Sequence, residues 1–243
     1  MIEGVGATEE IALTDAYRSS IEATVADASQ EGVVLDRTVF HPRGGGQPGD
    51  TGVLRWSGGE AIVTDTLRSA GRVMHVLQGY GPATGSVVSA EIDWERRYRL
   101  MKTHTALHAL SGIVWRDHGA KVTGGNMEPG AARMDFELDS VSGDFGREVE
   151  LRLNDALREG RPVRVRFLRR AEAASDPDLI RTKVNLIPET VDPIRVIEIE
   201  GLDRQADGGT HVGNTWEVGP VRVVKTENKG RTFKRMRIEL AET

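Results

Sequence analysis

The sequence has 243 residues, of which 38% are hydrophobic and 28% charged, and its formal net charge is −5. This composition is that of one or two globular domains, and it excludes a chain that is basic overall. The sequence contains no cysteine, which excludes disulfides, cysteine-type zinc sites, iron–sulfur clusters and thiol nucleophiles.

No stretch of the sequence approaches the roughly 20 consecutive apolar residues of a membrane-spanning helix. The first residues also lack the basic segment and apolar stretch of a signal peptide, so we expect a cytoplasmic protein without a membrane partner. Nothing in the sequence indicates an obligate protein partner. Glycine is frequent, with 28 residues, and aromatic residues make up only 5%, which predicts many turns and short strands.

The first third of the chain has the pattern of a β domain. Short runs rich in Val, Ile, Leu and Thr alternate with Gly, Pro, Ser and Asp, as strands alternate with turns. The predicted strands are Val33–Phe40, Gly52–Trp56, Ala61–Leu67, Arg72–Gln78 and Ser86–Ile92. Thr14–Ala26 precedes them and fits either a further strand or a short helix. Strands at about ten-residue spacing predict a small barrel or sandwich.

The rest of the chain mixes helices and strands. Apolar residues recur at helical spacing over Trp94–His118, and Gly119 suits a helix C-cap. A second helix is expected over Asp144–Glu159. The predicted strands are Lys121–Thr123, Ala131–Leu138, Val163–Leu168, Ile194–Ile199, Thr210–Val218, Val221–Lys225 and Phe233–Leu240. We therefore expect a β domain over 1–93 and an α+β domain over 94–243.

Two histidines, His104 and His108, lie four residues apart in the first of these helices. Such a pair lies on one face of a helix, one turn apart, and can share a metal ion. The spacing alone also fits two histidines without a common role. No Glu lies between them, which excludes the HExxH helix of a metalloprotease.

A second pair, Asp207 and His211, is also four residues apart, in a Gly-rich loop that is expected to enter a strand. Both residue types bind zinc, and the glycines would let the backbone fold closely around an ion. The alternative is a turn in which Asp207 caps a bend and His211 is exposed. Together the two pairs offer four ligands suited to zinc. The other histidines are expected to be structural or exposed: His41, His75 and His118.

A glycine-rich segment, Arg43-Gly-Gly-Gly-Gln-Pro-Gly-Asp50, follows the first predicted strand. Its backbone N–H groups could contact a phosphate or another ligand. Its composition favours a wide hairpin turn instead. It is neither a P-loop nor a dinucleotide-binding fingerprint, because no Lys-Ser/Thr pair and no helix follow it.

Basic residues gather on both sides of the predicted metal ligands. Those before the histidine helix are Arg96, Arg97, Arg99 and Lys102, and those in the C-terminal strands are Arg222, Lys225, Lys229, Arg231, Lys234, Arg235 and Arg237. A run of charge is usually a solvated face. Two basic clusters beside a metal site also suit a polyanion whose end reaches that site.

Several of these segments together resemble the family of alanyl-tRNA editing proteins. The run from His104 to His108 is similar to the family's HxxxH motif, and the run from Asp207 to Glu217 resembles its CGGTHVxxTxEIG motif. The segment Phe40-His-Pro-Arg-Gly-Gly-Gly-Gln-Pro-Gly-Asp resembles the glycine-rich motif of alanyl-tRNA synthetases and of the medium-length, free-standing AlaX proteins. The resemblance spans roughly residues 30–240. No adenylation or anticodon module fits in this length, so the resemblance is to the free-standing form.

The resemblance implies an α+β protein, with a small β-barrel domain followed by an editing domain of the threonyl and alanyl synthetase type. It implies a hydrolase that removes serine, and secondarily glycine, from misacylated tRNA(Ala). Such editing is needed because a pocket built for alanine cannot strongly reject an added hydroxyl. One zinc ion per chain would be bound by His104, His108, Asp207 and His211.

The sequence departs from the family at Asp207, which stands where the family usually has Cys. A carboxylate is a harder ligand than a thiolate, so the site should select zinc less strongly. We expect metal binding to persist, because the three histidines are present and three protein ligands suffice for a catalytic site.

The resemblance also suggests roles for other residues. Thr123 matches a family threonine and would hydrogen-bond the serine hydroxyl, unless it is simply a strand-end threonine. Gln47 would approach the site from the glycine-rich segment. The acceptor end of tRNA would be bound, mostly through phosphates, by Arg96, Arg97, Arg99, Lys102, Lys229, Arg231, Lys234 and Arg235. Two alternatives stay open: a metal-dependent hydrolase of another small ester or amide, and a non-catalytic tRNA-binding module that has lost its metal.

Overall fold

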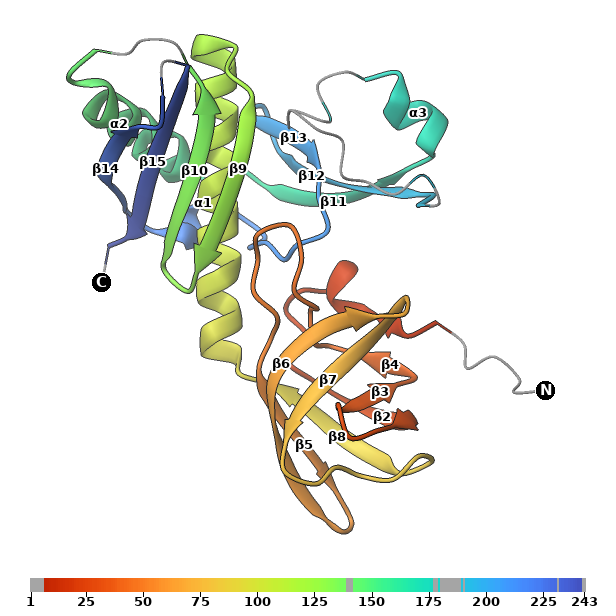
Figure 1. Ribbon diagram of the computed structural model, residues 1–243. Helices are drawn as coiled ribbons and strands as arrows, with labels where there is room; N and C mark the ends of the chain where they lie inside the picture. Colours follow the sequence, from red (N-terminus) through yellow and green to blue (C-terminus); the bar gives the residue numbers. More distant parts are fainter. Residues whose placement is uncertain are drawn as a thin grey trace. The chain divides into compact units, whose positions relative to one another are not determined.

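The computed structural model describes residues 7–138, 142–176, 179, 189, 191–230 and 232–241. The chain divides into two compact units, Met1–Tyr98 and Arg99–Thr243 (Figure 1). The domain boundary expected after residue 93 stays a prediction. Within the described ranges, no helix combines the length and the apolar character needed to cross a membrane.

The first unit contains a closed six-stranded barrel with the strand order β2-β3-β7-β6-β5-β8. Its strands are β2 (Ser20–Ala28), β3 (Val33–Leu35), β5 (Gly52–Trp56), β6 (Gly59–Ser69), β7 (Arg72–Gln78) and β8 (Val87–Ile92). Because the barrel is closed, the sheet has no unpaired edge strand. The apolar core of the barrel includes the fully buried Leu35, Leu54 and Val63. The predicted barrel is confirmed, and the undecided segment Thr14–Ala26 contains the start of β2.

The predicted strand Val33–Phe40 is instead divided into β3 and β4 (Arg37–Thr38). Asp36 interrupts it: the Asp36 carboxylate accepts the backbone N–H groups of Thr24 and Arg37, each at 2.8 Å. These bonds turn the chain away from the barrel, so that β4 pairs in parallel with β1 (Glu9–Glu10). A short 3-10 helix, η1 (Ile11–Leu13), follows β1.

The glycine-rich segment forms a tight turn. Gly44 and Gln47 exchange two backbone hydrogen bonds, of 3.0 and 2.9 Å. The two residues between them, Gly45 and Gly46, have φ of +58° and +87°. Two consecutive positive φ angles are typical of a two-residue hairpin turn and favour glycine at both positions. The favoured interpretation of this segment as a hairpin is therefore confirmed, but the turn is a tight two-residue turn and not the wide one expected.

The second unit has two antiparallel sheets and contains most of the helix α1 (Trp94–His118). The larger sheet has the order β14-β15-β10-β9, and the smaller one has the order β11-β12-β13. The strands are β9 (Val122–Glu128), β10 (Ala131–Glu137), β11 (Val163–Leu168), β12 (Ile194–Ile199), β13 (Asp203–Ala206), β14 (Val221–Asn228) and β15 (Phe233–Leu240). Two further helices are α2 (Phe145–Arg158) and α3 (Arg170–Ala174). The predicted α+β class is confirmed.

The central part of α1 is buried on all sides. Every residue from 103 to 114 is buried. A helix that is buried all round belongs to the core of its domain rather than to an amphipathic surface layer. The polar residues of this stretch therefore need partners inside the unit, and the two histidines of the HxxxH pair are among them.

The predicted strand Thr210–Val218 is wrong. The segment begins as a loop and ends in the 3-10 helix η3 (Thr215–Val218). The Asn214 side chain accepts the N–H of Trp216, and the Glu217 side chain accepts the N–H of Asn214. This capping box satisfies the backbone locally and competes with a sheet ladder. The elements that were not predicted include α3 and β13 of this unit and β1 and η1 of the first unit.

Candidate metal centre

Three histidines and one aspartate meet inside the second unit. His104, His108, Asp207 and His211 each offer one ligand atom, and these atoms all lie within 4.8 Å of one another. The three histidine residues are at most 7% exposed. Within the described ranges this is the one group of three or more His, Cys, Asp or Glu side chains arranged to hold a metal ion.

The HxxxH pair supplies two of these ligands from one face of α1. The imidazole centroids of His104 and His108 are 5.1 Å apart, and the His211 ring lies 4.2 and 4.7 Å from them. The Asp207–His211 loop therefore closes over the helix and completes the group. Local spacing positions each pair, and the tertiary structure brings the two pairs together.

The orientation of His108 is determined by a buried carboxylate. Its Nδ1 lies 2.9 Å from Oδ2 of Asp203, whose side chain is fully buried. Gln205 donates its amide to both Asp203 oxygens, at 3.1 and 3.0 Å, and to Ser111 Oγ at 3.2 Å. A proton on Nδ1 of His108 leaves the lone pair of Nε2 for a metal ion, as in carboxylate–histidine–metal arrangements.

Thr105 has a similar role toward His211. Its hydroxyl lies 3.2 Å from His211 Nδ1 and accepts the Val212 N–H at 3.2 Å. If the proton of His211 is on Nδ1, the lone pair of Nε2 faces the cluster. His211 Nε2 lies 3.0 Å from Asp207 Oδ2. Thr105 is thus the residue of the helical motif that orients the histidine of the loop.

Asp207 is held from two sides. Its Oδ2 accepts the Gly209 N–H at 2.6 Å and lies 3.7 Å from Arg195 Nη1, which also donates to the Asp207 carbonyl at 2.8 Å. Its Oδ1 lies 3.6 Å from His104 Nε2. The carboxylate therefore presents both oxygens to the histidines.

The electrostatics of the cluster keep Asp207 charged and His211 neutral. Burial by itself raises the pKa of the Asp207 carboxyl, but the neighbouring His104 and His211 outweigh burial and hold that pKa well below its usual range. Burial lowers the pKa of His211 to about 4. Metal ligands must be deprotonated to bind, and these are the protonation states that binding requires.

His108 differs, because its pKa is raised above its ordinary value. Burial acts to lower that pKa, but the hydrogen bond and negative charge of Asp203 outweigh burial. An anionic partner on Nδ1 also makes an imidazole a more basic ligand through Nε2.

The donor set fits a small divalent metal ion. Ligands at 2.0–2.1 Å from a tetrahedral ion lie about 3.4 Å from one another. Nε2 of His211 lies 3.0 Å from Oδ2 of Asp207, Nε2 of His104 lies 3.6 Å from Oδ1, and all four ligand atoms lie within 4.8 Å of one another. Three imidazoles and one carboxylate are a borderline-to-hard set that suits zinc and also other divalent transition metals.

Sequence reasoning missed the residues around the ligands. These are Asp203, which orients His108, Gln205, which donates to Asp203, and Thr105, which orients His211. Arg195 donates to the backbone of Asp207. A signal was available, since Asp203, Gln205 and Asp207 alternate as they would along one face of a strand. Thr105 also lies between the two histidines of the helical motif.

The predicted substrate contacts stay predictions. Thr123 is half-buried on the edge strand β9. Val122 lies opposite Phe136 and Gly124 opposite Asp135, so Thr123 is the extra residue of a β-bulge. A bulge re-aims a side chain and is frequent beside active sites. Gln47 belongs to the first unit, where its side chain is buried in the glycine-rich turn.

Among the predicted tRNA-binding residues, Arg97 is not available to a phosphate. It is fully buried, ion-paired to Asp50, and donates to the carbonyl oxygens of Val39 and Ala16. The expectation that Arg97 belongs to an exposed basic cluster is therefore corrected, because its guanidinium organises the first unit instead.

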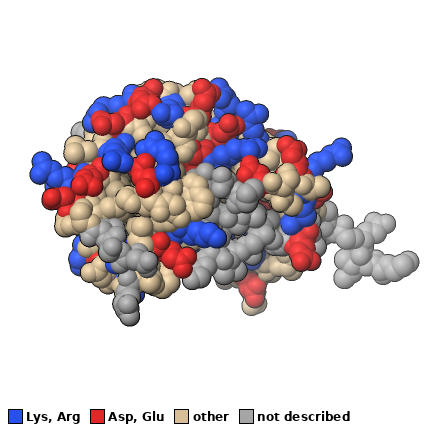
Figure 2. Space-filling view, turned by 90° about the horizontal axis from the view of Figure 1, so that it is seen from above, with Lys and Arg blue, Asp and Glu red and all other residues tan. Residues whose placement is uncertain are grey.

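The other basic residues differ in exposure. Lys234 is also buried, whereas Arg99 and Lys229 are exposed, and Arg96 and Lys102 are half-buried. Arg235 makes a two-pronged ion pair with Asp135. Arg231 lies outside the described residues. On the face shown in Figure 2, Lys and Arg side chains are interspersed with Asp and Glu.

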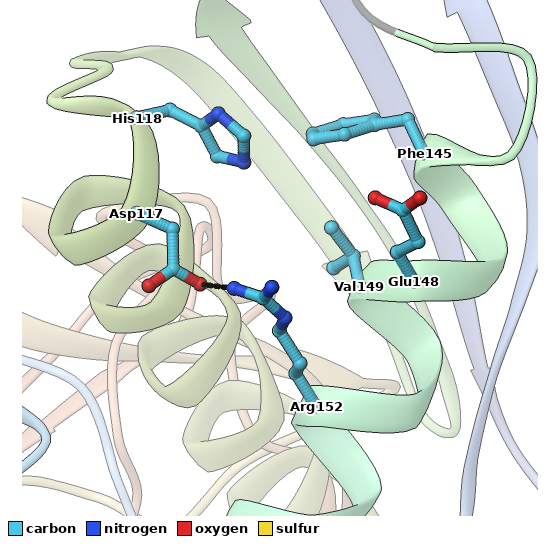
Figure 3. A pocket seen from close by; sticks show the side chains of 6 residues that line it. All are labelled: Asp117, His118, Phe145, Glu148, Val149 and Arg152. Carbon is cyan, nitrogen blue, oxygen red and sulfur yellow. Dashed lines mark hydrogen bonds and ion pairs between the residues drawn. The ribbon is translucent and has the colours of Figure 1, made fainter.

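A separate hollow lies between the C-terminal end of α1 and the start of α2 (Figure 3). One of its two acids, Asp117, is paired with Arg152 at 2.5 Å and with Arg116 at 2.9 Å. The His118 ring packs edge-on against Phe145 at 5.3 Å. None of the predicted site residues lines this hollow, and the expectation that His118 is structural or exposed is confirmed.

Comparisons with known proteins agree with this arrangement. Residues 7–96 match the family of class II (A) tRNA synthetases, and residues 194–237 match the threonyl and alanyl tRNA synthetase second additional domain. The chain is 36% identical over 242 residues to the alanyl-tRNA editing protein AlaX-M of Methanosarcina barkeri, covering 97% of this chain and 100% of that protein. It is 38% identical over 233 residues to AlaX-M of Saccharolobus solfataricus, covering 94% and 97%.

Similarity also extends to longer proteins. The chain is 37% identical over 230 residues to the alanine–tRNA ligase of Pyrobaculum arsenaticum, and the match covers 90% of this chain but 25% of the ligase. The near-complete coverage in both directions is found with the AlaX-M proteins. The chain belongs to the AlaX family of alanyl-tRNA editing proteins.

Proposed function

We propose that this protein is a metal-dependent deacylase that hydrolyses the ester bond of misacylated tRNA(Ala) in the cytoplasm. Serine is the main amino acid removed, and glycine is the second. The observation that carries the proposal is the buried group of three histidines and one aspartate in a chain of the AlaX family. Hydrolysis of an ester needs a group that stabilises charge on its carbonyl oxygen or activates water, and this group can hold an ion suited to both.

In this proposal His104, His108, Asp207 and His211 hold one zinc ion per chain. A bound zinc ion would act as a Lewis acid toward the ester carbonyl or lower the pKa of a water molecule. Asp203, Thr105 and Arg195 keep the ligands in position through the contacts described above. The Thr123 hydroxyl hydrogen-bonds the hydroxyl of a serine substrate.

The exposed and half-buried basic residues bind the acceptor end of tRNA, mostly through phosphates. Arg96, Arg99, Lys102, Lys229 and Arg235 fill this role. Phosphate contacts position a nucleic acid without reading its sequence. The choice of tRNA(Ala) therefore depends on other contacts.

The proposal is tested by deacylation of Ser-tRNA(Ala), Gly-tRNA(Ala) and correctly charged Ala-tRNA(Ala), with metal content measured on the same sample. We expect turnover of the first two substrates and about one metal ion per chain. His104→Ala should abolish both. His118→Ala is the matched control, since it removes an exposed histidine from the same helix and should retain both.

Two outcomes would replace the proposal. The first is a protein that binds metal and hydrolyses small amino acid esters but not aminoacyl-tRNA, which would indicate a hydrolase of another substrate. Absence of metal and turnover, with tRNA still bound, would indicate a non-catalytic tRNA-binding protein.

A further inference from the structure

The small sheet of the second unit aligns the metal ligand Asp207 with an exposed aromatic residue. Val196 of β12 pairs with Ala206, the last residue of β13. The next residue, Asp207, continues this register opposite Arg195, and its N–H donates to the Arg195 carbonyl at 3.1 Å. On its other side β12 pairs with β11, and Phe167 lies directly opposite Arg195. Directly opposite residues lie on the same face of a sheet. Phe167, Arg195 and Asp207 therefore form one row across one face.

The neighbouring row shows which way this face points. Val165 lies opposite Ile197, which lies opposite Gln205. Gln205 donates to Ser111 of α1. The face that bears Phe167 is therefore the face that packs on the histidine helix and contributes to the metal centre.

Only the inner part of this face is covered. Ile197 is fully buried and Arg195 is 8% exposed, whereas Val165 and Phe167 on β11 are 40% and 47% exposed. Within the described residues, β11 pairs with β12 alone, as the outer strand of the sheet (Figure 1). Val165 and Phe167 thus form an apolar shelf beside the metal centre, and we call this pair the β11 shelf.

The shelf lies at a distance that suits one part of the proposed substrate. Phe167 and Asp207 are separated by two strand spacings, or about 10 Å. In an aminoacyl-tRNA the scissile ester is attached to the ribose of the 3′-terminal adenosine. An ester bound at the metal centre therefore brings the terminal base within the span of one nucleoside.

We propose that the β11 shelf binds the 3′-terminal nucleobase of the tRNA, with the base stacked on Phe167 and packed against Val165. This inference rests on the proposed function. Single-stranded bases bind proteins mainly by stacking on aromatic rings, because every base has a π-face. Contiguous exposed apolar surface is one of the marks of a ligand-binding site.

Charge around the shelf is consistent with a nucleic acid. Arg195 lies within the row between the shelf and Asp207, and the exposed Arg169 follows the end of β11. Arg164 and Arg166 lie on the opposite face of β11, paired with Glu200 and Glu198. Exposed ion pairs of this kind are weak and exchange readily. Arg195 is buried and Arg164 and Arg166 face the other way, so the exposed Arg169 is the residue among these that offers a cation for a backbone phosphate near Phe167.

The test uses an uncharged acceptor-stem minihelix of tRNA(Ala), labelled at its 5′ end, with binding measured by fluorescence anisotropy. A second minihelix has an abasic ribose as its last nucleotide. The wild type should bind the intact minihelix about tenfold more tightly than the abasic one, as expected for one stacked base. Phe167→Ala should lose this difference, and Phe167→Trp should retain it. Leu151→Ala, which removes an exposed apolar side chain from α2, is the control and should behave as the wild type.

Kinetics give a second measurement. Phe167→Ala should raise KM for Ser-tRNA(Ala) about tenfold, and the effect should vanish on a substrate that lacks the terminal base, such as serine methyl ester. Equal discrimination by the wild type and Phe167→Ala would overturn the assignment of the shelf while leaving the proposed function intact. If the wild type deacylates no aminoacyl-tRNA, the proposed function fails. The minihelix measurement needs no turnover and still decides the role of the shelf.

Discussion

Nδ1 of His108 and Oδ2 of Asp203 lie 2.9 Å apart, although 95 residues separate them in the chain. Both groups are buried, and Gln205 holds the carboxylate on its other side. The pair links α1 to β13 and determines which nitrogen of His108 faces the other ligands. The candidate metal centre therefore depends on a residue that is not one of the four candidate ligands.

Asp203→Asn should weaken metal binding by about 10- to 100-fold, the usual cost of removing a carboxylate behind a histidine ligand. The neutral amide no longer stabilises a proton on Nδ1 of His108. Metal affinity is measured by competition with a coloured chelator. Asp155→Asn, which changes an exposed acid on α2, is the control. An unchanged dissociation constant for Asp203→Asn would mean that His108 is held by packing alone.

Metal loading should stabilise the protein through the cluster. A ligand that binds only the folded state at a hundred times its dissociation constant adds about 2.7 kcal/mol to the unfolding free energy. Zinc added to chelator-treated protein should therefore raise the melting temperature of the wild type and of His118→Ala, but not of His104→Ala. An equal rise in all three proteins would place the effective metal site elsewhere.

Arg97 should matter for stability rather than for tRNA binding. Its guanidinium is fully buried against Asp50, and removal of one partner leaves the other charge buried and uncompensated. Arg97→Leu should therefore destabilise the barrel unit by about 3–5 kcal/mol in urea unfolding. Arg99→Ala, which removes an exposed cation two residues further along α1, should change stability little. A stable Arg97→Leu protein with weakened tRNA binding would reverse this assignment.

The barrel should lose stability in acid because of His75. This residue is fully buried between Thr38 Oγ1 at 2.8 Å and the Val33 carbonyl at 3.1 Å. Burial lowers its pKa from 6.5 to about 4. The folded pKa is below the unfolded one, so the unfolded chain binds more protons between these values. Stability should fall as pH drops from 6.5 to 4, by a total on the order of 3 kcal/mol.

This prediction is checked by urea unfolding at pH 7 and at pH 4.5. His75→Gln removes the titrating group and should make the loss smaller than in the wild type. His118→Gln, at an exposed position, should leave the loss as it is. If His75→Gln is as acid-sensitive as the wild type, other groups cause the acid lability.

Binding of tRNA should weaken steeply with salt, because phosphate contacts release counterions. Lys229→Ala removes an exposed cation of the β14–β15 turn and should lower the slope of log affinity against log salt by about one. Titrations at several salt concentrations give this slope. Arg97→Leu is not suited to this test, because it perturbs folding. A flat salt response of the wild type would contradict a tRNA partner.

Much of the fold could be predicted from local patterns. The helical periodicity of Trp94–His118 and the β pattern of Phe233–Leu240 correspond to α1 and β15 as observed. These segments have strong periodicity, which tertiary contacts reinforce. The error at Thr210–Val218 arose where side-chain caps replace the sheet ladder. β13 was missed because its inward positions are polar, and hydropathy does not distinguish a buried polar face from a loop.

The sequence by itself identified the four candidate ligands. Each pair, His104 with His108 and Asp207 with His211, is recognised from a spacing of four residues within one helix or one loop. The sequence also determined the fold class, through hydrophobic periodicity, and the family, through several motifs in order. The tertiary structure alone decided that the two pairs converge, that Asp203 supports His108 and that Arg97 is buried. It also aligned Phe167 with Asp207 across three strands. Contacts between residues far apart in the chain depend on sheet register and packing, which local patterns do not encode.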